Sequence, residues 1–167
     1  MQAYLKNIVI DKSVRELCAH PYSNHPKGCP NFGKRATCPP QVKLIDEIFD
    51  LSKGFWVVWV DFDFKSHCNR MKRKHSNWSL CQIECCLYWQ GTARKQLKKT
   101  IQDVEYYLKG TENWMLVNEF CPEAMGVNVT ATMKKIGIEL EWPPKNIVRK
   151  IALFGVRRSP IKSEKKI

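Results

Sequence analysis

The sequence FWVVWVDFDF at residues 55–64 decides the expected fold. Its first six residues are continuously apolar, and its last four alternate between acidic and apolar side chains. This pattern is typical of a strand that is covered on both faces and then emerges at one end of a sheet. We therefore expect a central strand here, with other elements packed on both of its sides.

Further strands and helices are expected around this segment. Apolar and β-branched runs predict strands at residues 4–10, with a helix as the alternative there, at residues 114–117 with Phe120 beyond, and at residues 147–156. Apolar residues at three-to-four spacing predict helices at residues 42–51, 79–109 (divided near Gly91) and 128–136. The polar, basic residues 65–77 are expected to form an exposed connection. Strands that alternate with helices predict an α/β or α+β fold, with helices packed on a mixed sheet.

Length and composition indicate one domain. The chain has 167 residues, of which 44% are hydrophobic and 26% charged, a balance typical of globular proteins. We expect a single domain over residues 1–156. Residues 157–167 contain five basic residues and one acidic residue, and they predict a flexible basic tail.

The sequence also bears on location. The longest apolar run, Phe55–Val60, is far shorter than the roughly 20 residues that cross a bilayer, so we expect no membrane association. Met1–Lys6 lacks the features of a secretory signal, which predicts a cytoplasmic protein. In a reducing compartment, eight cysteines favour metal binding or catalysis over disulfides.

Three of these cysteines gather in a proline-rich loop. A capping box at Ser13–Glu16 predicts a helical turn that leads into Cys18. Cys29 and Cys38 follow, and residues 19–40 hold five of the nine prolines, which exclude a continuous helix or central strand. Thiolates on a stiff loop lose less conformational entropy when they bind a soft metal or a cluster. The loop therefore predicts a metal site.

Two observations argue for a more ordinary interpretation. Unpaired cysteine is among the most buried residue types, so the three thiols could pack separately in the core. Their spacing also differs from the tight two-residue pairs of zinc ribbons and bacterial ferredoxins.

Two blocks of the sequence resemble a known family. The segments Cys29-Pro-Asn-Phe-Gly-Lys34 and Cys38-Pro-Pro40 are similar to the N-terminal signature of a family of uncharacterised bacterial and archaeal predicted metal-binding proteins. Residues 122–137, which begin Pro-Glu-Ala-Met-Gly-Val-Asn-Val, are similar to that family's Glu-Ala-x-Gly-Ile-Asp-Val segment. The resemblance implies metal or iron–sulfur binding without an established reaction.

With this resemblance, we expect Cys18, Cys29 and Cys38 to be metal ligands, with Cys121 as the fourth. Relatives often carry several cysteines just before the second block, whereas this chain keeps only Cys121 there. Four thiolates would close the site, and three would leave a position at which zinc or iron could activate a substrate. The expected cofactor is a 4Fe-4S cluster or zinc. It would serve a redox partner or a small-molecule substrate, and whether the chain is an enzyme stays open.

Other cysteine, histidine and acidic residues form weaker patterns. Cys81, Cys85 and Cys86 are expected to pack as small apolar side chains on the helix at residues 79–109. The alternative is a metal held by Cys81 and Cys85, which are one helical turn apart. His67, Cys68 and His75 lie in the basic connection, where a solvated linker is expected and a second zinc site is the alternative. His20 and His25 could bind the metal or donate to one of its ligands, and Asp61 and Asp63 could bind a hard cation or serve acid–base chemistry. Ordinary structural roles are expected for all four.

The chain is strongly basic. It has 28 Lys and Arg against 16 Asp and Glu, a net charge of +12 that favours contact with polyanions. The alternative function is therefore an RNA- or DNA-binding module with a structural zinc, in which exposed Trp78 or Trp89 stacks on bases. No nucleic-acid-binding motif supports this alternative. Its candidate contacts are Arg70, Lys72, Arg73, Lys74, Arg94, Lys95, Lys98 and Lys99.

Overall fold

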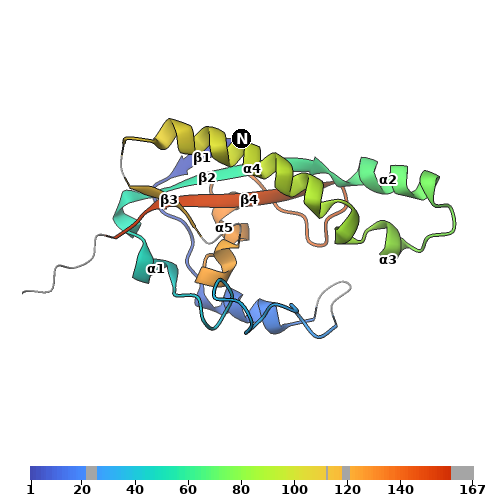
Figure 1. The fold of residues 1–167 in the computed structure, drawn as a ribbon, viewed down its shortest axis with the longest axis horizontal. Coiled ribbons are helices and arrows are strands. Elements are labelled where there is room, and N and C mark those ends of the chain that lie inside the picture. Colours follow the sequence, from blue (N-terminus) through green and yellow to red (C-terminus); the bar gives the residue numbers. More distant parts are fainter. Residues whose placement is uncertain (22–25, 112, 118–120, 159–167) are drawn as a thin grey trace, which may run out of the picture.

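The computed structural model describes residues 1–21, 26–111, 113–117 and 121–158. Its central strand, β2 (Phe55–Asp63), pairs along its whole length with β4 (Ile147–Val156). Strand β1 (Gln2–Leu5) pairs with the other edge of β2, and β3 (Trp114–Leu116) pairs with β4. The sheet has the order β1-β2-β4-β3, and each of these pairings is antiparallel (Figure 1).

Strand β2 is covered on both faces, which confirms the prediction from its apolar run. Helix α4 (Gln90–Leu108) packs on the face that carries Val58 and Phe154. The opposite face, which carries Phe55 and Leu153, contributes to a second core cluster (Figure 1). Successive side chains of a strand point to opposite faces, so β2 supplies both clusters. The second cluster also contains residues of α1 (Ile45–Ile48), the 3₁₀ helix η5 (Pro122–Met125) and α5 (Val129–Lys134).

Helix α2 (Phe64–Lys74) begins directly after β2, so the prediction of an exposed connection at residues 65–77 is wrong. The Ser66 N–H donates a hydrogen bond of 2.8 Å to the Asp63 carboxylate, which caps the helix. Phe64 and His67, three residues apart, bury one helical face. The cap and the buried face together stabilise α2, although most of its exposed residues are polar or basic. The buried face joins a third core cluster, the aromatic cluster of Phe62, Phe64, Trp89 and Ala93.

The helix predicted at residues 79–109 is divided into three elements. Helix α3 (Leu80–Ile83) and the 3₁₀ helix η3 (Cys86–Tyr88) precede α4, and the break lies before Gln90 rather than at Gly91. Trp89 explains the break, because its ring is buried in the aromatic cluster and its indole N–H donates to the Glu84 carbonyl at 3.1 Å.

The helix predicted at residues 42–51 is also shorter than expected. Only α1 and the 3₁₀ turn η2 (Leu51–Lys53) form, because Phe49 is buried in the core and makes a β-bridge with Arg157. The first strand ends at Leu5 rather than residue 10. Strands β3 and β4 and helix α5 agree with their predicted ranges, and Phe120 lies outside the described residues.

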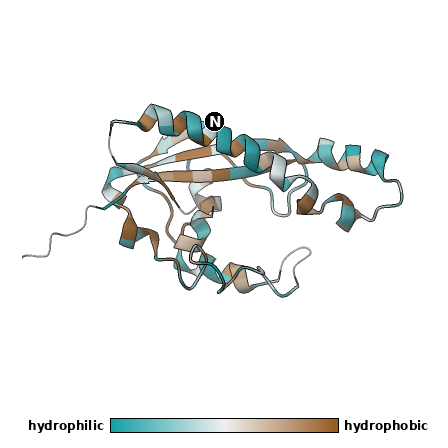
Figure 2. Ribbon diagram, viewed as in Figure 1, coloured by the Kyte–Doolittle hydropathy of each residue, from teal (hydrophilic) through white to brown (hydrophobic). Residues whose placement is uncertain are grey.

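These elements make a single-domain α+β fold, which confirms one of the two expected classes, with an antiparallel rather than a mixed sheet. Figure 2 shows apolar residues on the strands and a largely hydrophilic α2. Within the described ranges, no helix combines the length and apolar character needed to cross a membrane. Most of the predicted tail lies beyond the described residues, so its boundary stays a prediction.

Candidate metal centre

The N-terminal segment and the segment that follows β3 lie side by side. The Asp11 N–H donates a hydrogen bond of 2.8 Å to the Gly126 carbonyl. The 3₁₀ helix η1 (Lys12–Ala19) then packs against η5. Cys18 lies near the end of η1, and Cys121 directly precedes η5. Residues about a hundred positions apart in the sequence therefore approach one another.

A turn at Gly28 joins Cys29 to Cys18. The Cys29 N–H donates a hydrogen bond of 2.8 Å to the Cys18 carbonyl. Gly28 has a φ of +77°, and a Cβ at this position would lie 2.6 Å from the Ala19 carbonyl oxygen. Glycine is required here because a side chain would collide with the backbone and because L-residues rarely adopt this φ.

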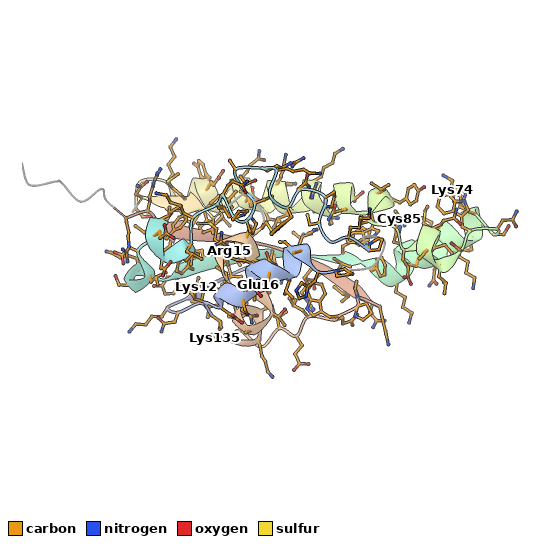
Figure 3. The ribbon with its side chains drawn as sticks, turned by 90° about the horizontal axis from the view of Figure 1, so that it is seen from below. Lys12, Arg15, Glu16, Lys74, Cys85 and Lys135 are labelled. Carbon is orange, nitrogen blue, oxygen red and sulfur yellow. The ribbon has the colours of Figure 1, made fainter. Side chains whose placement is uncertain are left out.

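Arg15 ties the Cys38 turn to the same helix. The Val42 N–H donates to the Cys38 carbonyl at 3.1 Å, and the Arg15 guanidinium donates to the Val42 carbonyl at 2.7 Å. Arg15 lies on η1 (Figure 3), the helix that carries Cys18. The loop that bears Cys29 and Cys38 is therefore attached to η1 at two points.

The predicted ligands are close enough for their charges to interact. Desolvation raises the pKa of Cys18, and negative charge on Cys29 and Cys38 raises it further. Desolvation likewise raises the pKa of Cys121 to about 12, with smaller contributions from Glu123, Cys18 and Cys38. Cys121 is exposed to solvent, but the surrounding protein still displaces enough water to be the largest cause of this shift. Thiols that oppose one another's ionisation favour a bound cation, which would offset their charge.

Glu123 and Lys150 are charged residues at this site that the sequence patterns did not single out. Burial raises the pKa of Glu123, while a hydrogen bond with the Cys121 side chain opposes the rise. Desolvation lowers the pKa of Lys150 on β4, and Glu123 and Cys121 counteract this shift. The position of Glu123 two residues after Cys121 was a usable signal. No sequence signal pointed to Lys150, because its proximity to Cys121 and Glu123 depends on where β4 lies in the fold.

Comparison with protein families adds independent evidence. The DUF2284 family, described as "Predicted metal-binding protein", matches residues 4–118. The chain belongs to this family. Searches of curated proteins and of solved structures found no match. The resemblance noted in the sequence is thereby confirmed, and the chain is a member of a predicted metal-binding family.

The DUF2284 match covers Cys18, Cys29 and Cys38 but ends before Cys121 and the second block at residues 122–137. The assignment of Cys121 as a ligand therefore depends on its place beside η1. All four ligand assignments stay predictions.

Within the described residues, no three or more His, Cys, Asp or Glu side chains form a group that could hold one metal ion. The donor set nevertheless fits a soft metal or an iron–sulfur cluster, since both are bound by thiolates. The structure thus brings four cysteines into one region without closing a single-ion site.

Among the other cysteines, Cys81 is exposed, so the expectation that it packs as an apolar side chain is wrong. Helix α3 ends at Ile83, so Cys81 and Cys85 do not share a continuous helical face. Cys68 and Cys86 pack against the aromatic cluster. None of the eight cysteines, which all lie within the described residues, forms a disulfide.

The histidine and acidic candidates are also accounted for structurally. His67 is 3% exposed and lies against the rings of Phe62 and Phe64. Asp61 pairs with Arg149 at 3.2 Å, and Asp63 caps α2 as described above. His20 is exposed at the end of η1, and His25 lies outside the described residues.

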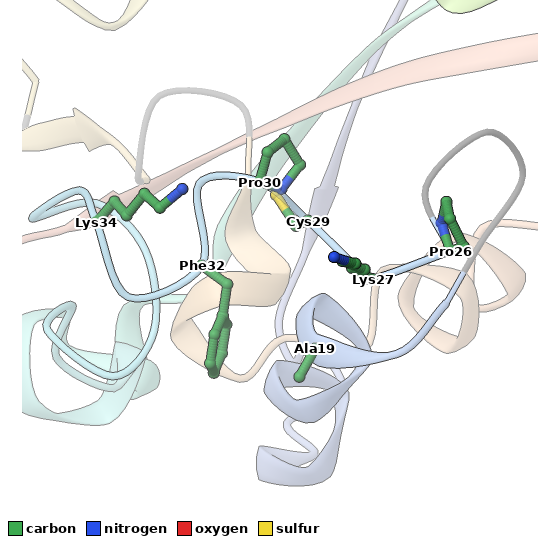
Figure 4. A pocket seen from close by; sticks show the side chains of 8 residues that line it. Ala19, Pro26, Lys27, Cys29, Pro30, Phe32 and Lys34 are labelled. Atoms are coloured by element: carbon green, nitrogen blue, oxygen red, sulfur yellow. The ribbon is translucent and has the colours of Figure 1, made fainter.

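A pocket of about 540 Å³ opens beside Cys29 (Figure 4). Its size lies within the range of roughly 300–1,000 Å³ typical of small-molecule sites. Phe32 contributes an apolar wall, and Lys27 and Lys34 contribute positive charge. A small anionic molecule would match this lining.

The candidate nucleic-acid contacts lie on two helices. Arg70, Lys72, Arg73 and Lys74 are exposed on α2, and Arg94, Lys95, Lys98 and Lys99 are exposed on α4. Trp89 is 8% exposed, so the expectation that it could stack on bases is wrong.

Proposed function

We propose that this DUF2284 protein binds a cysteine-ligated metal centre through Cys18, Cys29, Cys38 and Cys121. The observation that carries the proposal is the convergence of η1, the proline-rich loop and the segment before η5. It places Cys18 within electrostatic range of Cys29 and Cys38, and Cys121 within range of Cys18 and Cys38. None of the four thiols is buried in the core. The turn at Gly28 and the Arg15 contact support the proposal, because both hold the loop against η1 before any ligand binds.

A 4Fe-4S cluster is favoured over zinc. Zinc requires its sulfur ligands to converge on a single ion at about 2.3 Å. The described side chains form no such group. A cluster distributes its cysteines over separate iron atoms and therefore needs less convergence. Such a centre would supply electron transfer with a redox partner, or activation of a small substrate at an open position, in the cytoplasm.

The chain's own charges would support either role. Desolvation raises the pKa of Cys18, and the Arg15 guanidinium offsets a small part of this rise. Lys150 lies within electrostatic range of Cys121 and Glu123. The pocket beside Cys29, with Lys27 and Lys34, would allow an anionic substrate to approach the centre. Whether this amounts to enzymatic activity depends on whether one metal position stays open.

Anaerobic purification, followed by iron, zinc and acid-labile sulfide analysis and a visible spectrum, tests the proposal. A brown protein with iron and sulfide in near-equal amounts is expected. Cys29→Ser and Cys38→Ser should each abolish the absorption, whereas Cys81→Ser, which changes an exposed thiol, should preserve it. Full metal content in both loop variants would refute the ligand assignment. Colourless protein with stoichiometric zinc would replace the cluster with a zinc site.

A further inference from the structure

The α2–α3 hairpin carries an unusual concentration of positive charge. From Phe64 to Ile83 the sequence contains no acidic residue. Five cations lie in this range, on α2, and all of them are exposed. They are Lys65, Arg70, Lys72, Arg73 and Lys74. Figures 1 and 3 show this hairpin at one end of the molecule, with Lys74 well away from Lys12 and Arg15.

A stack of aromatic rings adjoins these cations. The rings of His75 and Trp78 are parallel within 8°, with centroids 3.9 Å apart. Tyr88 lies against the same Trp78 ring at a tilt of 34°, with its centroid 5.0 Å from that of Trp78. The Trp78 N–H donates to the His75 carbonyl at 3.0 Å, so the backbone fixes the turn that holds the first two rings.

The stack ends at the surface. Tyr88 is 50% exposed, and the neighbouring Leu80 and Leu87 are 69% and 82% exposed. These exposed apolar and aromatic side chains lie on the segment that follows α2, a helix whose only charged residues are cations. A pocket of about 380 Å³ lined by Asn69, Lys72 and Arg73 lies on α2.

We propose that the α2–α3 hairpin binds single-stranded nucleic acid. The cations of α2 would contact phosphates, and an unpaired base would stack on the half-exposed ring of Tyr88. Nonspecific single-strand binding depends on this combination of a basic track and aromatic platforms. A duplex is a poorer fit, because its bases are already stacked on one another. This proposal does not depend on the metal centre.

Fluorescence anisotropy with fluorescein-labelled single-stranded dT15 and U15, between 50 and 200 mM salt, tests the proposal. Binding that weakens steeply with salt is expected. The triple variant K72Q/R73Q/K74Q should lower the salt slope by about 2, because each single-strand phosphate contact contributes about 0.7. The matched variant K6Q/K12Q/K134Q removes the same charge from other exposed lysines and should bind like wild type.

Variants of Tyr88 separate stacking from charge. Tyr88→Ala should weaken binding by about 5- to 100-fold with an unchanged salt slope, whereas Tyr88→Phe should retain the affinity. Tighter binding to a labelled duplex of the same length, or binding only to phosphatidylserine vesicles, would overturn the proposal. Equal losses in both triple variants would also overturn it, because the effect would then reflect net charge alone.

Discussion

The Cys29 backbone N–H donates a hydrogen bond of 2.8 Å to the carbonyl of Cys18, and Gly28 makes the intervening turn possible. This contact brings together two thiols that are 11 positions apart in the sequence. It depends on backbone alone, so it can form before any metal is present. A loop held by such a bond before a ligand binds would lose less conformational entropy when a centre assembles.

Gly28→Ala should therefore abolish metal binding. The new Cβ would lie 2.6 Å from the Ala19 carbonyl oxygen, at a backbone angle of +77° that alanine disfavours. Gly33→Ala is the matched control, because Gly33 has a φ of +70° but no atom within 4 Å of the position that a Cβ would take. Metal content per chain is the measurement, with circular dichroism to verify folding. Gly33→Ala should keep its metal, and similar losses in both variants would show that the backbone angle, rather than the collision with the Ala19 carbonyl, controls the site.

Glu123→Gln should make Cys18 and Cys121 more reactive in the metal-free protein. The Glu123 carboxylate raises the pKa of both thiols, so its removal increases the thiolate fraction at a given pH. Iodoacetamide labelling at pH 8, followed by mass spectrometry, should show alkylation several times faster at both residues.

Glu84→Gln provides the crossed control for this experiment. Glu84 raises the pKa of Cys68, so this variant should accelerate labelling of Cys68 alone. Unchanged labelling of Cys18 and Cys121 in Glu123→Gln would contradict the electrostatic interaction at the centre.

Gly155→Ala should destabilise the sheet by about 1–3 kcal/mol. A Cβ at residue 155 would lie 2.6 Å from the ring of Phe55 and 2.8 Å from that of Phe49, and both rings are buried. Gly91→Ala, in an exposed position of α4 with no atom within 4 Å, should instead be neutral or stabilising by up to about 1 kcal/mol. Urea denaturation measures both, and equal stabilities would argue against the tight packing of β2 on β4.

The free energy of unfolding should decrease below about pH 4.5, and protonation of Glu141 should cause part of this decrease. Backbone and side-chain hydrogen bonds from Asn146 and a backbone bond from Lys145 lower the pKa of Glu141 to about 2. Because the folded-state pKa lies below the ordinary value, the contribution is complete above about pH 4.5 and is lost as the pH falls towards 2. Glu141→Gln should flatten the fall of the unfolding free energy in this window. Glu139→Gln, at an exposed position, should keep the wild-type dependence of the unfolding free energy on pH. The same wild-type dependence in Glu141→Gln would refute the argument.

The central strand and the cysteine loop could be predicted because their signals are local. The apolar run at residues 55–60 requires cover on both faces, and the prolines around Cys29 and Cys38 exclude regular structure wherever the loop lies. Helix α2 was missed because its cap, Asp63, and its buried face, Phe64 and His67, lie among residues whose polarity suggested a solvated connection.

The amino-acid sequence by itself determined the sheet-forming segments, the stiff thiol loop and the basic character of the chain, since each follows from neighbouring residues. Only the tertiary structure decided that Cys121 lies within electrostatic range of Cys18 and Lys150, and that Trp78 lies against both His75 and Tyr88. The physical reason is that such contacts depend on how separate segments of the chain pack together, such as η1 on η5. No local pattern of polar and apolar residues encodes which of those surfaces meet.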